Sequence, residues 1–207
     1  GESNVMEEQT RIKICGLTRL EDIDAVNELK PEYVGFVFAK SRRQITKEHA
    51  VTLRRYLDPE IQAVGVFVNE LPAIVAGYLE EGVIDLAQLH GNESEEYIHS
   101  LRFRTGGELI KAFSIKTRED VEKAKKSSAD YILLDHGKGG TGESFDWSLT
   151  RNMDRPYFLA GGLNAENVEQ AILQTHPFAV DISSGVETDG VKDPKKITEC
   201  IRRIRHV

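Results

Sequence analysis

The sequence predicts a single-domain α/β protein folded as a closed (β/α)8 barrel, the TIM-barrel fold. Eight short runs rich in β-branched and apolar residues are each followed by an amphipathic helical pattern. These runs start about every 24 residues, enough for one strand, one helix and two short loops. An open doubly wound sheet is the alternative, but eight regular repeats without a linker favour closure. We therefore expect one catalytic domain over residues 11–207.

The expected strands are short and separated by helical segments. They cover Arg11–Cys15, Tyr33–Phe38, Ala63–Val68, Asp85–Leu89, Leu109–Phe113, Asp130–Leu134, Tyr157–Ala160 and Phe178–Ile182. Helix starts are marked by a capping-box pattern at Thr18–Glu21 and by the N-cap candidates Asn69, Asn92, Thr117, Asn164 and Asp193. Apolar residues at helical spacing predict the core-facing positions Ile23, Val26, Leu29, Ile74, Val75, Tyr78, Leu79, Val168, Ala171, Ile172, Ile197, Ile201 and Ile204.

The charge balance argues against several classes of protein. There are 27 Lys and Arg against 34 Asp and Glu, a formal net charge of −7. Such an acidic chain is not a general binder of nucleic acid or anionic membranes. The longest apolar run, residues 33–39, is far shorter than the ~20 residues of a membrane helix.

The cysteines and the N-terminus indicate where the protein works. Cys15 and Cys200 do not form a disulfide framework, and this fits a reducing compartment. Residues 1–10 are polar and acidic, lack the features of a secretory signal, and are expected to be a disordered or cloning-derived extension. We expect a cytoplasmic protein.

Polar residues follow the expected strands, where a barrel of this kind carries its active site. The polar residues and the glycines at or just after the ends of these strands are Cys15, Arg42, Arg43, Asn69, Gln88, His90, Asp135, Gly161, Gly162, Asp181, Ser183, Ser184 and Gly185. Because side chains alternate along a strand, the apolar neighbours of these residues face the helices and the polar ones face the barrel interior. The alternation directs Lys13 and Cys15, Gln88 and His90, and Asp181 and Ser183 inward.

Cys15 and Asp135 are the candidates for acid–base chemistry. Cys15 ends the first strand above Lys13, whose charge would favour a thiolate. Asp135 follows the apolar run 131–134, where a carboxyl group can serve as a general acid. The alternatives are a small buried cysteine and a loop-capping aspartate. Cys200 has ordinary core spacing on the last helix and is interpreted as packing.

Two glycine-bearing loops predict a phosphate site. Gly161 and Gly162 follow the seventh strand, and Ser183, Ser184 and Gly185 follow the eighth. In this fold the loops after these strands bind phosphate through backbone N–H groups, although ordinary turns are the alternative.

The remaining candidates for ligand binding are Arg42, Arg43 and His90. One of the two arginines would bind a carboxylate with its guanidinium fork, unless both are solvated charges. His90 is either a ligand-binding or a satisfied interior histidine. We expect no metal ion, because the spacing of possible ligands is unconvincing.

The segment Gly137–Gly142 matches the pattern G-x-G-x-x-G of dinucleotide-binding loops. Such a loop belongs in the first βα turn of a nucleotide-binding unit, whereas this one follows the sixth strand. We interpret it as a lid over Asp135 and expect no cofactor.

These residues, taken in order, resemble those of the phosphoribosylanthranilate isomerase family. The resemblance runs from Arg11 to the C-terminus and rests on the segments 13–18, 34–38, 41–43, 64–69, 88–91, 134–147, 161–164 and 180–187. It implies a cofactor-free Amadori rearrangement in tryptophan biosynthesis, in which N-(5-phosphoribosyl)anthranilate becomes 1-(2-carboxyphenylamino)-1-deoxyribulose 5-phosphate. One departure is the segment from Asp135 to Trp147, which looks shorter than is common in the family.

The resemblance also implies roles for individual residues. Cys15 corresponds to the general base, Asp135 to the general acid, and Arg43 to the arginine that holds the anthranilate. We expect Arg43, Gln88, His90 and Asp181 to bind the substrate, and Gly161, Gly162, Ser183, Ser184 and Gly185 to bind its phosphate. The partner is thus a small molecule, with monomer and homodimer both open. Another sugar-phosphate isomerase or epimerase, or a non-catalytic phosphate-binding barrel, is the alternative.

Overall fold

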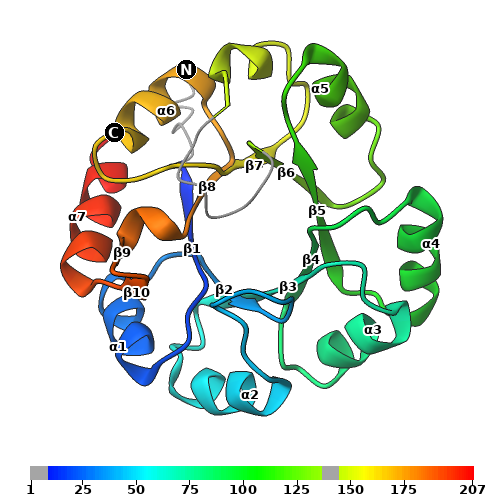
Figure 1. The fold of residues 1–207 in the computed structure, drawn as a ribbon, viewed down its shortest axis with the longest axis horizontal. Coiled ribbons are helices and arrows are strands. Elements are labelled where there is room, and N and C mark those ends of the chain that lie inside the picture. Colours follow the sequence, from blue (N-terminus) through cyan, green and yellow to red (C-terminus); the bar gives the residue numbers. More distant parts are fainter. Residues whose placement is uncertain (1–8, 137–144) are drawn as a thin grey trace, which may run out of the picture.

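Eight parallel strands close into a barrel surrounded by helices, as the sequence predicts (Figure 1). The structure is a computed structural model that describes residues 9–136 and 145–207. Neighbouring strands pair in chain order, and β1 pairs with β8 to close the ring. The expected lid, Gly137–Gly142, and the first eight residues of the expected N-terminal extension lie outside the described residues.

The strand boundaries agree with the expected ones to within one residue. The strands are β1 (Arg11–Cys15), β2 (Tyr33–Val37), β3 (Gln62–Phe67), β4 (Leu86–Leu89), β5 (Glu108–Ser114), β6 (Tyr131–Asp135), β7 (Tyr157–Leu159) and β8 (Ala179–Ile182). The agreement follows from burial on both faces, which makes each strand a nearly continuous apolar run.

Seven α-helices cover the barrel in the described part of the chain. They are α1 (Leu20–Leu29), α2 (Lys47–Tyr56), α3 (Pro72–Glu80), α4 (Glu95–Arg104), α5 (Arg118–Lys125), α6 (Val168–Thr175) and α7 (Pro194–Arg205). Between β6 and β7 the described residues form only the 3-10 turn η1 (Trp147–Thr150), so the expectation of an α-helix in every repeat was wrong there. Pro156 lacks an N–H and prevents a helix from continuing into β7.

The eighth repeat contains an additional short segment before its helix. The 3-10 turn η2 (Ser184–Val186) is followed by a small antiparallel hairpin of β9 (Glu187–Thr188) and β10 (Val191–Lys192). Figure 1 shows this segment between β8 and α7, on the side of the ring that carries α1.

The N-cap predictions were correct for α5 and α7. The Thr117 hydroxyl accepts the N–H of Asp120, and the Asp193 carboxylate accepts the N–H of Lys195. The prediction for α1 was wrong by one residue. Its N-cap is Arg19, because the carboxylate of Asp22 accepts the N–H groups of both Thr18 and Arg19.

Three predicted asparagine caps were also wrong. Asn69 has a left-handed backbone (φ 51°), and α3 starts after Leu71 because proline favours the first helical position. Ser94 caps α4 in place of Asn92. Asn164 accepts the N–H groups of Glu166 and Asn167, and thus caps the turn that precedes α6.

The core has two layers, one between strands and helices and one inside the barrel. Among the predicted core positions, Ile197, Ile201 and Ile204 are buried, as is Cys200, which confirms its packing role. Ile74 is 40% exposed, so the prediction that it packs in the core was wrong. The inner layer consists of Tyr33, Val64, Leu86, Ile110, Ala112, Leu133, Phe158, Ala160 and Ala179. This apolar layer fills the interior of the barrel.

No helix in the two described ranges has both the length and the apolar character needed to cross a bilayer.

We expect Phe158→Ala to destabilise the barrel strongly. The Phe158 ring is fully buried and packs against Tyr33, Tyr131 and Phe178, with centroids 5.3 to 5.8 Å apart. Removing a buried aromatic ring costs about 3–5 kcal/mol of unfolding free energy. Urea denaturation measures the loss, with Phe103→Ala, a residue 92% exposed, as the control. Similar losses in both variants would contradict the packing described here.

Candidate active site

The polar residues at the strand ends converge on one mouth of the barrel, because all eight strands are parallel. Cys15 ends β1, His90 follows β4, Asp135 ends β6, and Ser183 follows β8. The hydrogen bonds described below join the ends of β1, β4 and β8 across the barrel interior, and His90 brings β4 close to Asp135 on β6. The sequence-predicted candidates therefore come together at one site.

Lys13 lies one layer below this mouth and is fully buried. Its ammonium group donates to Gln88 Oε1 at 2.6 Å and to Asp181 Oδ2 at 2.9 Å. Burial by itself lowers the pKa of Lys13, but the charges and hydrogen bonds of Asp181 and Cys15 together outweigh this effect, so the pKa is raised. A charged lysine thus joins β1, β4 and β8 from the inside.

Only one of the two carboxylate oxygens of Asp181 is bonded to a described residue. Asp181 Oδ1 is buried, and no hydrogen-bond donor reaches it within residues 9–136 and 145–207. A buried acceptor without a donor is costly, so this atom is suited to a donor supplied by a ligand.

Cys15 is buried at the end of β1, and its Sγ lies directly over Gly35 of β2. A Cβ atom at Gly35 would overlap the sulfur, so glycine makes room for the thiol. Burial raises the pKa of Cys15, whereas the charge of Lys13 lowers it. The net pKa is raised, so the expectation that Lys13 favours a thiolate is correct in sign but outweighed by burial.

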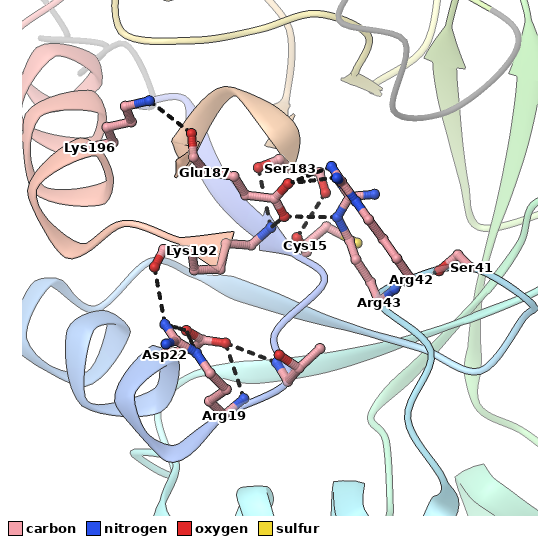
Figure 2. Close-up of polar contacts among 11 residues, drawn as sticks. Cys15, Arg19, Asp22, Ser41, Arg42, Arg43, Ser183, Glu187, Lys192 and Lys196 are labelled. Carbon is pink, nitrogen blue, oxygen red and sulfur yellow. Dashed lines mark hydrogen bonds and ion pairs between the residues drawn. The ribbon is translucent and has the colours of Figure 1, made fainter. Parts of the chain in front are cut away.

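Glu187 is the centre of a cluster of cations (Figure 2). Its side chain, 4% exposed, accepts Arg43 Nε at 2.8 Å and Arg43 Nη2 at 2.7 Å. Arg42 Nη2 and Lys192 Nζ donate to the same carboxylate at 3.1 and 2.6 Å. Burial raises the pKa of Glu187, but Arg43 and Lys192 outweigh burial, so the pKa is lowered. Three cations therefore share one carboxylate.

The two arginines differ in how firmly they are held. The Arg43 side chain is 13% exposed and makes a two-point contact with Glu187, whereas that of Arg42 is 58% exposed and makes one. Gly16 has a positive φ of 91°, and a Cβ there would lie 2.5 Å from Arg43 Cδ. The backbone after Cys15 thus leaves space for Arg43.

Sequence reasoning missed Glu187 and Lys192 as site residues. The hairpin of β9 and β10 brings Lys192 back onto Glu187, and the ammonium also donates to the carbonyl of Ser183. Burial lowers the pKa of Lys192 despite the opposing charge of Glu187. In the sequence, Glu187 ends the segment 180–187 that carries part of the resemblance, but no local pattern there indicates its partners.

Asp135 faces His90, which is hydrogen-bonded to Gln88 and through it to Lys13 in the barrel interior. Its Oδ1 accepts the N–H of His136 at 2.6 Å, and its Oδ2 lies 3.6 Å from Nε2 of His90. The amide Nε2 of Gln88 lies 2.8 Å from Nδ1 of His90. A cavity of about 360 Å³ opens beside this group, lined by His90, Gly91, Asn92, Glu93, Lys111, Ala112, Phe113, Ser114, Asp120, Lys123 and Asp135.

The two glycine-bearing loops lie against each other. A Cβ at Gly185 would overlap the carbonyl oxygen of Leu163, so only glycine permits this approach. Gly161 and Gly162 have positive φ values of 95° and 66°. In the described part of the chain, the amides of Gly162, Ser184 and Gly185 donate to no backbone carbonyl. Such free amides can bind an anion.

The Ser183 hydroxyl is oriented differently from the neighbouring amides. It donates to the backbone carbonyl of Cys15 at 3.1 Å, and so ties β8 to β1. Among residues 9–136 and 145–207, no group of three His, Cys, Asp or Glu side chains is placed to hold a metal ion.

Comparisons with known proteins identify the family of this chain. Residues 12–203 match the family model of N-(5'phosphoribosyl)anthranilate (PRA) isomerase. The N-(5'-phosphoribosyl)anthranilate isomerase of Thermoanaerobacter pseudethanolicus is 46% identical, and the match covers 95% of this chain and 98% of the relative. That of Clostridium acetobutylicum is 48% identical, with 94% and 98% covered.

Solved structures agree as well. The phosphoribosyl anthranilate isomerase of Thermotoga maritima superimposes with a TM-score of 0.87 at 39% identity, covering 96% of this chain and 100% of that one. A phosphoribosyl anthranilate isomerase in complex with reduced 1-(o-carboxyphenylamino)-1-deoxyribulose 5-phosphate gives a TM-score of 0.84 at the same identity and coverage. This chain therefore belongs to the N-(5'-phosphoribosyl)anthranilate isomerase family of enzymes.

Proposed function

We propose that Cys15 and Asp135 catalyse the isomerisation of N-(5'-phosphoribosyl)anthranilate in this enzyme, as general base and general acid. The product is 1-(2-carboxyphenylamino)-1-deoxyribulose 5-phosphate, and the reaction belongs to tryptophan biosynthesis. The observation that carries the proposal is the position of a thiol and a carboxyl group at the ends of β1 and β6, which open on the same mouth.

The reaction proceeds in three steps with a balanced exchange of protons. Asp135 donates a proton to the ribose ring oxygen, the C1–O bond breaks, and the nitrogen lone pair forms an iminium ion. The thiolate of Cys15 then removes the proton from C2, which the iminium ion has acidified, and an enolamine results. Loss of the enol O–H proton and protonation of C1 give the ketone, an isomer of the substrate.

Arg43 is the proposed partner of the anthranilate carboxylate. Glu187 holds its Nε and one terminal nitrogen, so the other terminal nitrogen is free to donate to the substrate. The cluster of Arg42, Arg43 and Lys192 around one carboxylate has an excess of positive charge. This excess suits an anionic ligand beside Cys15.

The phosphate is proposed to bind between the loops after β7 and β8. Support comes from the amides of Gly162, Ser184 and Gly185, and from the positive φ of Gly161. Asp181 Oδ1, a buried acceptor without a donor in the described residues, is proposed to accept from a hydroxyl group of the sugar. A free thiol at Cys15 requires reducing conditions, and we propose that the enzyme works in the cytoplasm.

Cys15→Ala should abolish turnover while leaving substrate binding intact. Alanine retains the backbone of β1 but has no group that can accept the C2 proton. A fluorescence assay that follows loss of N-(5'-phosphoribosyl)anthranilate measures turnover, and it also tests the activity of the unmodified enzyme. Cys200→Ala, which removes the other thiol far from the mouth, should change activity little. A near wild-type kcat in Cys15→Ala would show that another group is the base.

In the variant Asp135→Asn, in which residue 135 cannot titrate, the residual activity should rise with pH above neutrality. Burial raises the pKa of Cys15, so the thiol stays protonated at neutral pH and the thiolate forms only as the pH increases. Because kcat/KM reports groups of the free enzyme and the introduced asparagine carries no titrating proton, kcat/KM of this variant should increase with pH through the pKa of the thiol. A profile of this variant that is flat from pH 7 to above the unperturbed thiol pKa of ~8.5 would contradict the role of Cys15.

Asp135→Asn should lower kcat by about 10²–10⁴-fold with little change in KM. Asparagine preserves the shape and the hydrogen bond to the N–H of His136 but cannot donate an acidic proton. Steady-state kinetics at saturating substrate provide the measurement, and Asp24→Asn on the exposed face of α1 is the control. If the two variants have the same kcat, the proton has another source.

Arg43→Lys should raise KM although the charge is retained. Lysine cannot bind Glu187 and a substrate carboxylate at the same time with a planar fork. Arg42→Ala should have a much smaller effect, because Arg42 is mostly exposed and makes a single contact with Glu187. Binding of a reduced product analogue, measured by calorimetry, separates the two variants. Equal losses of affinity would argue against Arg43 as the specific ligand.

A further inference from the structure

We propose that Gln88 is a positioning residue that holds His90 with its ring proton on Nε2, directed toward Asp135. Sequence analysis placed Gln88 among the residues that bind substrate. Its side chain is buried, and both of its polar ends are already bonded to protein groups. The effect on catalysis rests on the proposed role of Asp135, whereas the position of the proton does not.

Lys13 determines which way the Gln88 amide faces. An ammonium group has three donors and no acceptor, so only the amide oxygen can bind it. The two atoms are 2.6 Å apart, and Asp181 holds the same ammonium from the other side at 2.9 Å. The reverse orientation of the amide would place NH2 against NH3+, and the amide is therefore fixed.

The fixed amide in turn determines the tautomer of His90. The amide nitrogen of Gln88 only donates, and it lies 2.8 Å from Nδ1 of His90. A ring nitrogen that accepts a hydrogen bond carries no proton. The neutral imidazole must therefore carry its proton on Nε2.

The Nε2–H group faces the proposed general acid. Nε2 lies 3.6 Å from Asp135 Oδ2, too far for a good hydrogen bond but close enough for both groups to contact one substrate oxygen. After Asp135 has given up its proton, its carboxylate and the reacting oxygen are neighbours of a fixed N–H donor. This donor favours the state after proton transfer, so its loss should affect kcat more than KM.

The tautomer can be observed directly by long-range 1H–15N NMR of the histidine rings in the whole protein. The measurement is made at a pH about two units above the reference histidine pKa of ~6.5. In the wild type, His90 should show a protonated Nε2 and an unprotonated Nδ1. In Gln88→Glu, a carboxylate faces Nδ1, so the proton should move to Nδ1. His49 is the internal control, because its Nε2 lies 2.6 Å from the carbonyl of Thr18 and should remain protonated.

Gln88→Met provides a second variant in case the added charge prevents folding. It removes both hydrogen bonds with little change in volume, so the His90 signals should shift toward a mixture of tautomers. Its kcat should fall about 10-fold or more while KM changes less than about 2-fold. In an Asp135→Asn background the same change should cost no further kcat. A wild-type His90 with its proton on Nδ1, or a tautomer unchanged in both variants, would overturn the proposal.

These outcomes separate the two proposals. If Asp135→Asn retains wild-type kcat, the role of the acid fails, while the tautomer measurement still tests Gln88 independently.

Discussion

The ammonium of Lys13 lies fully buried inside the barrel, and the arrangement of the mouth follows from the need to pair it. An unpaired charge in the interior costs several kcal/mol, so Lys13 requires acceptors on other strands. Asp181 supplies a carboxylate from β8, and Gln88 supplies an amide oxygen from β4. Each of these partners is then oriented by the contact. One oxygen of Asp181 is bonded to Lys13 while the other has no donor within the described residues, and the amide nitrogen of Gln88 is directed at His90.

A second set of charges, centred on Glu187, also acts on the Cys15 thiol. Lys13 and Lys192 both lower the pKa of Cys15, but each is paired with a carboxylate, from Asp181 and Glu187 respectively. The pairing reduces the field at the sulfur, and burial therefore determines the sign of the pKa shift. Desolvation makes the thiolate rarer in the free enzyme but a stronger base once formed. This balance suits the removal of a proton from carbon.

Features that depend on neighbouring residues could be predicted from the sequence, whereas contacts between residues far apart in the sequence could not. The strand boundaries could be predicted to within one residue. The inward direction of Lys13 and Gln88 could also be predicted, because the alternation of side chains along a strand is a local property. Helix starts were less predictable, since Asp22 and Pro72 compete with the nearest Thr or Asn for the cap. The contact of Arg43 with Glu187 spans 144 residues and depends on a two-stranded hairpin, and no local pattern indicates it. The long-range ion pairs of the site therefore required the structure.

The contacts between β1 and β8 both close the barrel and position residues of the site. In the register of β1 and β8, Lys13 pairs with Asp181, so the buried ion pair bridges the two strands that close the ring. One step toward the mouth, the Ser183 hydroxyl bonds to the carbonyl of Cys15, and Glu187 then reaches the loop that carries Arg43. The proposed base is thus placed by contacts that exist only in the closed barrel. The same few polar contacts therefore stabilise the closed barrel and assemble the site. In a sheet that failed to close, Cys15, Asp181 and Arg43 would no longer lie close together.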